Sequence, residues 1–202
     1  NVSSANGSNY NLFFKKGSSD NLIIFFSGGG VVWNSESAHQ PINLWSLLSI
    51  DEDGFFGAYF DSIPGYKPET LEGLVQEFNT ENPFNNWTVV YIPYSTGDFH
   101  TGNADTEYIN SNGVSKTLQH YGQKNVLAAL DWTEKLLDSS DGKLLVAGES
   151  AGAFGSTFWL PKICEITAKN KIYHMIDSGY LYYPDWPVIA DTYWGADWEA
   201  TF

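Results

Sequence analysis

The sequence contains no arginine, and all ten of its basic residues are lysine. Against them stand 24 acidic residues, so the 202-residue chain carries a formal net charge of −14. Phosphate binding requires clustered cations, and arginine is the side chain that grips a phosphate or a carboxylate at two points. The composition therefore argues against a protein that binds nucleic acid.

Cysteine and long apolar runs are also scarce. Cys164 is the only cysteine, which excludes a disulfide within the chain and a cysteine-based zinc site. No apolar run approaches the ~20 residues that a membrane-spanning helix needs. Hydrophobic residues still make up 43% of the chain, enough for a packed core. We therefore expect one folded domain over residues 1–202 with no membrane span.

The chain does not begin with methionine, and its first residues do not look like a signal peptide. We therefore expect a mature or excised form. Asn-X-Ser/Thr sequons occur at Asn1, Asn6 and Asn86. They would accept glycans in a secreted protein, and chance occurrence in an Asn- and Ser-rich sequence is the alternative. On this basis we expect a glycoprotein of the extracellular space or the secretory pathway.

Continuous apolar runs alternate with helical patterns along the chain. The runs predict buried strands at 21–26, 87–94, 143–148 and 171–176, with an edge strand near 12–14. Helices are expected at 122–138 and at 152–160, where Pro161 should end the second, and shorter ones near 44–50 and 71–78. This order predicts an α/β fold with a mostly parallel sheet and helices on both faces. Ligands of such sheets bind at the carboxyl ends of the strands.

The segment Gly148-Glu149-Ser150-Ala151-Gly152 fits the pattern G-x-S-x-G between a predicted strand and a predicted helix. In that setting the serine occupies a tight, strained turn, and its hydroxyl stands at the helix N-terminus, where negative charge is favoured. Ser150 is therefore the candidate nucleophile. The alternative is a glycine-rich packing or phosphate-binding turn.

A second glycine-rich segment, Ser27-Gly28-Gly29-Gly30, follows the first buried run. An esterase needs backbone N–H donors for the oxyanion, one from the residue after the nucleophile and others from a loop after an earlier strand. Ala151, Gly29 and Gly30 fit these positions. A plain turn or a phosphate cradle are the alternatives, although the P-loop ending and a G-x-G-x-x-G after a strand are both missing.

Several segments in order resemble the pectin acetylesterase and Notum-like carboxylesterase family, its bacterial-type members above all. They are FFSGGGVVWN (25–34), YIPYSTGDFHTGN (91–103), QHYGQKN (119–125), ALDW (129–132), GESAGAFGS (148–156) and IDSGY (176–180). The resemblance implies an α/β-hydrolase-like three-layer sandwich that cleaves acyl esters with a Ser-His-Asp triad. It implies that Ser150 is the nucleophile, that Gly29, Gly30 and Ala151 form the oxyanion hole, and that Val31, Val32 and Trp33 line the acyl pocket. Relatives often carry cysteine where this chain has Val32, Ser95 and Glu149.

The resemblance places the acid and the histidine of the triad beyond residue 202. Only His174 follows Ser150, and it lies inside an apolar run, where a packed strand residue is expected rather than a base. We therefore expect a hydrolase truncated on its C-terminal side, whose remaining triad residues belong to a longer form or a second chain. Such a form would expose an open sheet edge and could be inactive.

Local substitutes for the missing groups are few. Asp177 could serve as the acid, or it could make a structural hydrogen bond in its turn. His100 could contact substrate or act as base, with Asp98 and Asn103 bracing its loop. His120 is expected to cap or pack the long helix and His39 to lie in a polar loop. No metal-ligand spacing appears, and no metal or cofactor is expected.

These observations favour a serine ester hydrolase that removes acetyl-like acyl groups from a carbohydrate or protein ester through an acyl-enzyme. Its partner would be a small acyl ester or an acylated glycan or protein. Polyanionic pectin should be repelled by a chain of charge −14, which favours a neutral substrate. The alternatives are an inactive binding module of the same fold, or a lipase or peptidase.

Overall fold

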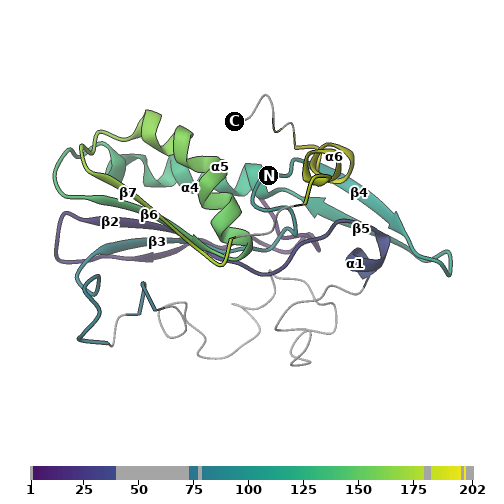
Figure 1. The fold of residues 1–202 in the computed structure, drawn as a ribbon, viewed down its shortest axis with the longest axis horizontal. Helices are drawn as coiled ribbons and strands as arrows, with labels where there is room; N and C mark the ends of the chain where they lie inside the picture. Colours follow the sequence, from purple (N-terminus) through teal and green to yellow (C-terminus); the bar gives the residue numbers. More distant parts are fainter. Residues whose placement is uncertain (1, 40–72, 77–78, 180–182, 197, 199–202) are drawn as a thin grey trace.

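The computed structural model describes residues 2–39, 73–76, 79–179, 183–196 and 198. The helix expected near 44–50 lies outside the described residues, and so does most of the one expected near 71–78, of which 73–75 form a turn. A five-stranded sheet in the order β1-β3-β2-β6-β7 is the centre of the fold (Figure 1). Its strands are β1 (Phe13–Lys15), β2 (Leu22–Phe26), β3 (Thr88–Ile92), β6 (Leu144–Glu149) and β7 (Ile172–Asp177).

The sheet is parallel except at one edge, where β1 runs antiparallel to β3. All four predicted buried runs form strands, with bounds that differ by one or two residues, and the predicted edge strand is present. The mostly parallel α/β fold is therefore confirmed. Burial differs at β7, where every residue after Ile172 is exposed.

The order in which the chain adds strands to the sheet changes direction at β2. It passes from β2 to β3 on one side and later returns to place β6 on the other side. Phe26 pairs with Ile92 in β3 and with Gly148 in β6, so the loops after β2 and β6 leave the sheet at the same level. Such a switch point is where open parallel sheets bind ligands.

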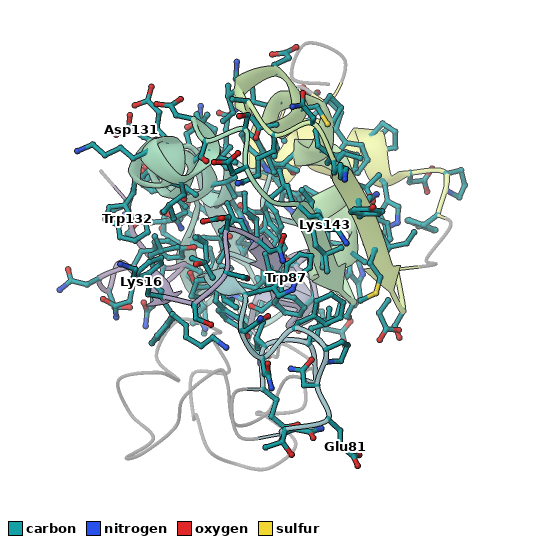
Figure 2. The ribbon with its side chains drawn as sticks, turned by 90° about the vertical axis from the view of Figure 1, so that its left-hand side faces the viewer. Lys16, Glu81, Trp87, Asp131, Trp132 and Lys143 are labelled. Carbon is teal, nitrogen blue, oxygen red and sulfur yellow. The ribbon has the colours of Figure 1, made fainter. Side chains whose placement is uncertain are left out.

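The opposite end of the sheet carries the amino ends of the strands. Figure 2 looks onto this end, with Trp87 and Lys143 directly preceding β3 and β6. The Ser27–Gly30 and Glu149–Ser150 segments follow the carboxyl ends of β2 and β6, so they lie at the end of the sheet turned away from this view.

Two long helices, α4 (Gly122–Leu137) and α5 (Ala151–Ile166), cover the same face of the sheet (Figure 1). Their buried side chains, among them Val126, Leu130 and Trp159, form one core with Ile24 and Val146 of the sheet. On the opposite face, Val75 and Trp87 pack against strand residues that include Ile23 and Tyr91. Within the described part of the chain, no long helix covers that second face.

Pro161 does not end α5, so this prediction was wrong. The helix continues to Ile166 with Pro161 inside it. A proline in a helix interior costs about 3 kcal/mol because it removes one hydrogen bond and crowds the preceding turn. Trp159 and Ile163 lie on either side of it and are both buried in the core. We attribute the continuation to this packing, since burying two large side chains offsets the cost.

A hairpin of β4 (Ala104–Ile109) and β5 (Ser115–His120) forms a separate two-stranded sheet that the sequence did not predict. Most of its side chains are polar, and within the two strands only Tyr108, Leu118 and His120 are buried. No apolar run therefore marked it. His120, expected at the start of a helix, ends β5 instead. The remaining short elements are α1 (Ser35–His39), α6 (Trp186–Ile189) and the π-helical turn η2 (Ala190–Trp194).

Across the described ranges, no helix combines the length and the apolar composition needed to cross a lipid bilayer.

Candidate active site

Ser150 occupies the turn between β6 and α5 with backbone angles of φ 49° and ψ −119°. An L-residue rarely adopts this region, and such strain persists only where the surrounding structure enforces it. Two main-chain hydrogen bonds hold the turn: the Ser150 N–H donates to the Asp177 carbonyl at 2.8 Å, and the Ser150 carbonyl accepts from Ala153 at 3.1 Å. The residue is exposed. The strand–turn–helix geometry that the motif predicts is present.

The glycines on either side of Ser150 are required by close backbone contacts. A Cβ atom at Gly148 would collide with the Gly152 carbonyl, and one at Gly152 would collide with the Phe26 carbonyl of β2. The two glycines therefore allow α5 to begin directly against the ends of β6 and β2. A larger residue at either place would push the turn away from the sheet.

Gly28 brings the glycine-rich loop against the same turn. A Cβ atom there would lie 2.8 Å from Ser150 Cβ and 2.7 Å from the Glu149 carbonyl oxygen. The sequence pointed to Gly29 and Gly30 and gave no signal for the contact of Gly28, which depends on the register that pairs Phe26 with Gly148. Gly30 has φ 87°, a conformation that favours glycine.

The loop is anchored at its first residue, Ser27, which is 5% exposed. The Ser27 N–H donates to the Ile92 carbonyl at 3.1 Å, and the Ser27 hydroxyl oxygen accepts from the Tyr94 N–H at 2.8 Å. The Ser27 carbonyl accepts from His100 Nε2 at 3.0 Å. The N–H, the hydroxyl oxygen and the carbonyl of this residue are therefore all engaged before the glycines begin.

The loop is anchored again at Val32. Its N–H donates to the Gly97 carbonyl at 2.8 Å, and its carbonyl accepts from the indole N–H of Trp194 at 2.7 Å. A short loop fixed at both ends keeps its amides in place without reorganising when charge develops nearby, which is the property that an oxyanion site requires.

Ala151 supplies the third proposed amide. It is the first residue of α5, and the first N–H groups of a helix have no acceptor within the helix. The positive end of the helix dipole adds a field that favours negative charge beside Ser150. The turn can therefore present both the Ser150 hydroxyl and a backbone N–H donor to the same functional group of a ligand.

His100 is not placed to contact a substrate, contrary to the expectation from the sequence. Its side chain is buried, with the residue 2% exposed, and its ring packs against Phe26 and Tyr94 at centroid distances of 5.3 and 4.8 Å. Burial lowers the pKa of His100 to about 4, so the ring is neutral near pH 7. Because its Nε2 faces a carbonyl oxygen, that nitrogen carries the hydrogen.

Asp98 braces this loop as expected. Its buried carboxylate accepts hydrogen bonds from the Thr96 hydroxyl at 2.6 Å and from the N–H groups of His100, Gly102 and Gly122 at 3.1, 3.1 and 2.8 Å. Asn103 takes part through its N–H, which donates to the Trp194 carbonyl at 2.7 Å.

Asp177 lies at the carboxyl end of β7, where it is exposed. Its carbonyl supports the Ser150 turn, and its carboxylate accepts from the Ser178 hydroxyl at 2.9 Å. The structural hydrogen bond in this turn, which was the alternative to an acid role, is therefore present. Within the described residues, no histidine hydrogen-bonds to Asp177 or to Ser150.

The other three histidines make structural contacts away from Ser150. His174 Nε2 lies 3.1 Å from the Ser156 hydroxyl of α5. The two ring nitrogens of His120 contact the Tyr108 hydroxyl at 2.8 Å and the Thr96 carbonyl at 2.7 Å. His39 ends α1 rather than lying in a loop, and its Nε2 contacts the Tyr108 carbonyl at 3.1 Å.

The expected acyl-pocket residues differ in exposure. Val31 and Val32 are buried in a cluster with Phe99, Ala151 and Trp194. Trp33 is 37% exposed beside them. A cavity of about 570 Å³ opens beside Glu149 and Asp177 instead, with a lining that includes Phe25, Phe84, Met175 and Glu81. In the part of the chain that the structure describes, no side chains gather as a metal-binding group.

The profile of the pectinacetylesterase family matches residues 1–190. Among solved structures, the Wnt deacylase Notum from Drosophila aligns in two crystal forms. The first has a TM-score of 0.64 at 19% identity, over 100% of this chain and 62% of that one. The second has a TM-score of 0.61 at 17% identity, over 98% and 63%. No curated protein sequence matches. The Notum likeness shows a shared fold, of which this chain spans less than two thirds.

Proposed function

This chain belongs to the pectinacetylesterase family, and on that basis we propose that it is a serine ester hydrolase that removes acetyl-like acyl groups from a carbohydrate or protein ester. The observation that carries the proposal is the strained, exposed Ser150 with Gly28 packed directly against it. The family supports ester deacylation in general, and the nucleophile and its donors are our assignment.

In the proposed reaction, the Ser150 oxygen attacks the acyl carbonyl while a histidine base takes its proton. The N–H groups of Gly29, Gly30 and Ala151 stabilise the oxyanion, each by roughly 3–4 kcal/mol. The alcohol leaves with a proton from the histidine, and water then hydrolyses the acyl-enzyme. No cofactor enters these steps.

The base must be a histidine other than the four in this chain, because each of these makes structural contacts away from Ser150. We propose that base and acid come from polypeptide beyond these 202 residues, either a continuation or a second chain. The longer Notum chains are consistent with this proposal. Asp177 stays a lesser candidate for the acid.

The charge near Ser150 favours a neutral acyl acceptor. Glu149 and Asp177 flank the turn, Glu81 lines the adjacent cavity, and the chain as a whole carries a charge of −14. A polyanionic glycan would be repelled by these groups. We therefore propose a neutral acylated glycan or an acylated protein as the substrate class.

One observation favours a second candidate, a binding module without catalysis: no described histidine reaches Ser150. A panel of p-nitrophenyl esters from acetate to palmitate, applied to the longest natural form of the protein, distinguishes the two. We expect the acetyl ester to react fastest, and Ser150→Ala to lower kcat by at least about 10⁴-fold. Ser140→Ala, at an exposed serine in another loop, should leave kcat unchanged. No turnover of any ester by the wild type favours the binding module. Turnover that survives Ser150→Ala contradicts Ser150 as the nucleophile, and preference for long chains indicates a lipase.

The 202-residue form gives a separate test of the missing base. We expect little or no labelling of Ser150 by a fluorophosphonate, because the hydroxyl has no base to accept its proton. Rapid labelling of this form, absent in Ser150→Ala, would show that the base is already present and our assignment of it is wrong.

We also propose an extracellular or secretory setting. Support comes from Asn6, which is exposed and whose amide oxygen accepts from the Ser8 N–H at 3.0 Å within its sequon. Mass spectrometry of the protein from its native source should find a glycan on Asn6 if the proposal holds and an unmodified peptide if it does not.

A further inference from the structure

The peptide that joins Ser27 to Gly28 is the first of the glycine-rich loop, and its orientation affects the path of the chain into Gly29 and Gly30, whose N–H groups are the proposed oxyanion donors. The Ser27 carbonyl lies just past the end of β2 and is buried, so it needs a hydrogen-bond partner. The partner is His100 Nε2, at 3.0 Å. Because a peptide unit is planar, the direction of the Ser27 carbonyl also sets the direction of the Gly28 N–H.

The imidazole that makes this bond is held on every side. Its ring lies between Phe26 and Tyr94, and a Cβ atom at residue 155 would come within 2.6 Å of its Cδ2, so the ring fits because α5 carries a glycine there. Such packing confines the ring. The Nε2 atom is therefore presented to Ser27 in one position.

The main chain of His100 is held as firmly as its ring. Its N–H donates to Asp98 at 3.1 Å, and its carbonyl accepts from the Trp159 indole of α5 at 2.9 Å. The residue has φ 65°, which is unfavourable for an L-residue. A strained conformation retained by several hydrogen bonds is typical of functional sites.

We propose that His100 is a positioning residue of the esterase site, whose Nε2–H bond to the Ser27 carbonyl fixes the triple-glycine loop against Ser150. The expected effect of His100 on catalysis rests on the proposed function. The expected effect of His100 on the order of the loop rests on the hydrogen bond alone. Among the described residues, two titratable side chains face the ring, those of Asp98 and Tyr94. The ring itself stays neutral near pH 7.

The test compares two substitutions of similar size. In His100→Gln, the side-chain amide can still donate to Ser27, whereas in His100→Met nothing can. Hydrogen exchange followed by mass spectrometry on the peptide containing residues 28–32 reports the order of the loop whether or not the protein is active. We expect His100→Met to speed exchange there by roughly tenfold and His100→Gln to restore most of the protection.

In the longest natural form, we expect His100→Met to lower kcat for the acetyl ester by roughly 10–100-fold with KM little changed, because the loop acts on the transition state. His100→Gln should recover much of that loss. His174→Met is the matched control, since it removes a histidine that contacts Ser156, and it should leave exchange at residues 28–32 and kcat unchanged.

Equal exchange at residues 28–32 in the wild type and His100→Met overturns the proposal, and so does failure of glutamine to restore protection. If His100→Met does not fold, the ¹⁵N shifts of the His100 ring in the wild type decide instead. Hydrogen on Nε2 supports the proposal, and hydrogen on Nδ1 overturns it. Activity that survives Ser150→Ala would contradict the proposed function. It would not affect the hydrogen-exchange and ¹⁵N measurements, which test the hydrogen bond of His100 by themselves.

Discussion

Single residues at the end of β6 carry the chemistry proposed for this protein. Ser150 adopts strained backbone angles, and three glycines at 28, 148 and 152 let the chain pack around it. Glycine is needed at these three positions because the backbone of one segment touches another there and leaves no room for a Cβ atom. Substitution at such a position tests the geometry directly.

Gly28→Ala should disable the site, with some loss of stability. The new methyl group would overlap Ser150 Cβ and the Glu149 carbonyl, so the turn or the loop must move. We expect kcat for the acetyl ester to fall by about 10²-fold or more, because a shift of this size misplaces the oxyanion donors. Gly73→Ala, where a Cβ atom meets nothing within 4 Å, is the control. Unchanged kcat in Gly28→Ala would contradict the proposed packing.

Protonation of His100 should lower the free energy of unfolding of the protein in acid. Its pKa falls from 6.5 in the unfolded chain to about 4 in the fold because it is buried. The unfolded chain therefore binds the proton more readily, and the stability present above pH 6.5 is lost as the pH falls towards 4, by about 3 kcal/mol in full.

Urea denaturation of the wild type and His100→Gln at pH 7 and pH 4.5 measures this loss. Burial also lowers the pKa of His120 and of His174, but both remain in the variant and cancel in the comparison. We expect the wild type to lose more stability than His100→Gln between the two pH values. Parallel losses would show that His100 titrates normally in the fold.

At the scale of secondary-structure elements, α4 depends on a distant residue for its start. Tyr121 precedes the helix and makes no side-chain capping bond. The Gly122 N–H donates instead to the buried carboxylate of Asp98, 24 positions earlier in the chain. The same carboxylate orders the loop that holds His100. One side chain therefore links the helix to the candidate site.

Asp98→Ala should cost about 3 kcal/mol or more in the free energy of unfolding, because four buried donors lose their acceptor. Asp105→Ala is the control: Asp105 is exposed and accepts one bond, from the Tyr121 hydroxyl, so its loss should stay within about 0.5 kcal/mol. Chemical denaturation measures both. Similar losses of stability in the two variants would mean that the four hydrogen bonds to Asp98 do not stabilise the fold as proposed.

At the scale of the whole molecule, the sheet ends in an exposed strand. β7 pairs with β6 on one side, and among the described residues no strand pairs with its other side. Tyr173, Met175 and Ile176 are 51, 39 and 56% exposed. An apolar unpaired edge of this kind promotes association between chains. Within the part of the chain that the structure describes, the expected open edge is thus present, and a single domain over residues 1–202 stays a prediction.

Met175→Lys should reduce self-association of the 202-residue form, since a charge on this strand opposes pairing with another edge. Sedimentation velocity over a range of concentrations measures the effect. Ala128→Lys adds the same charge at an exposed position of α4 and serves as the control. If both variants behave alike, the relief comes from net charge and the edge is not the contact.

The sequence by itself determined the elements whose signal is local. Continuous apolar runs predicted the four parallel strands, and Gly148–Gly152 predicted the turn that carries Ser150, because burial on both faces and a tight turn each restrict composition within a few neighbouring residues. The family resemblance rested partly on the same segments.

Only the tertiary structure decided what depends on contacts between distant segments. It extended α5 past Pro161 through packing on the sheet and formed a polar hairpin at 104–120. It also buried His100 against Ser27, where the sequence suggested a contact with substrate. Register between β2 and β6 placed Gly28 in contact with Ser150. Such outcomes follow from free energies summed over residues far apart in the chain, which no local pattern contains.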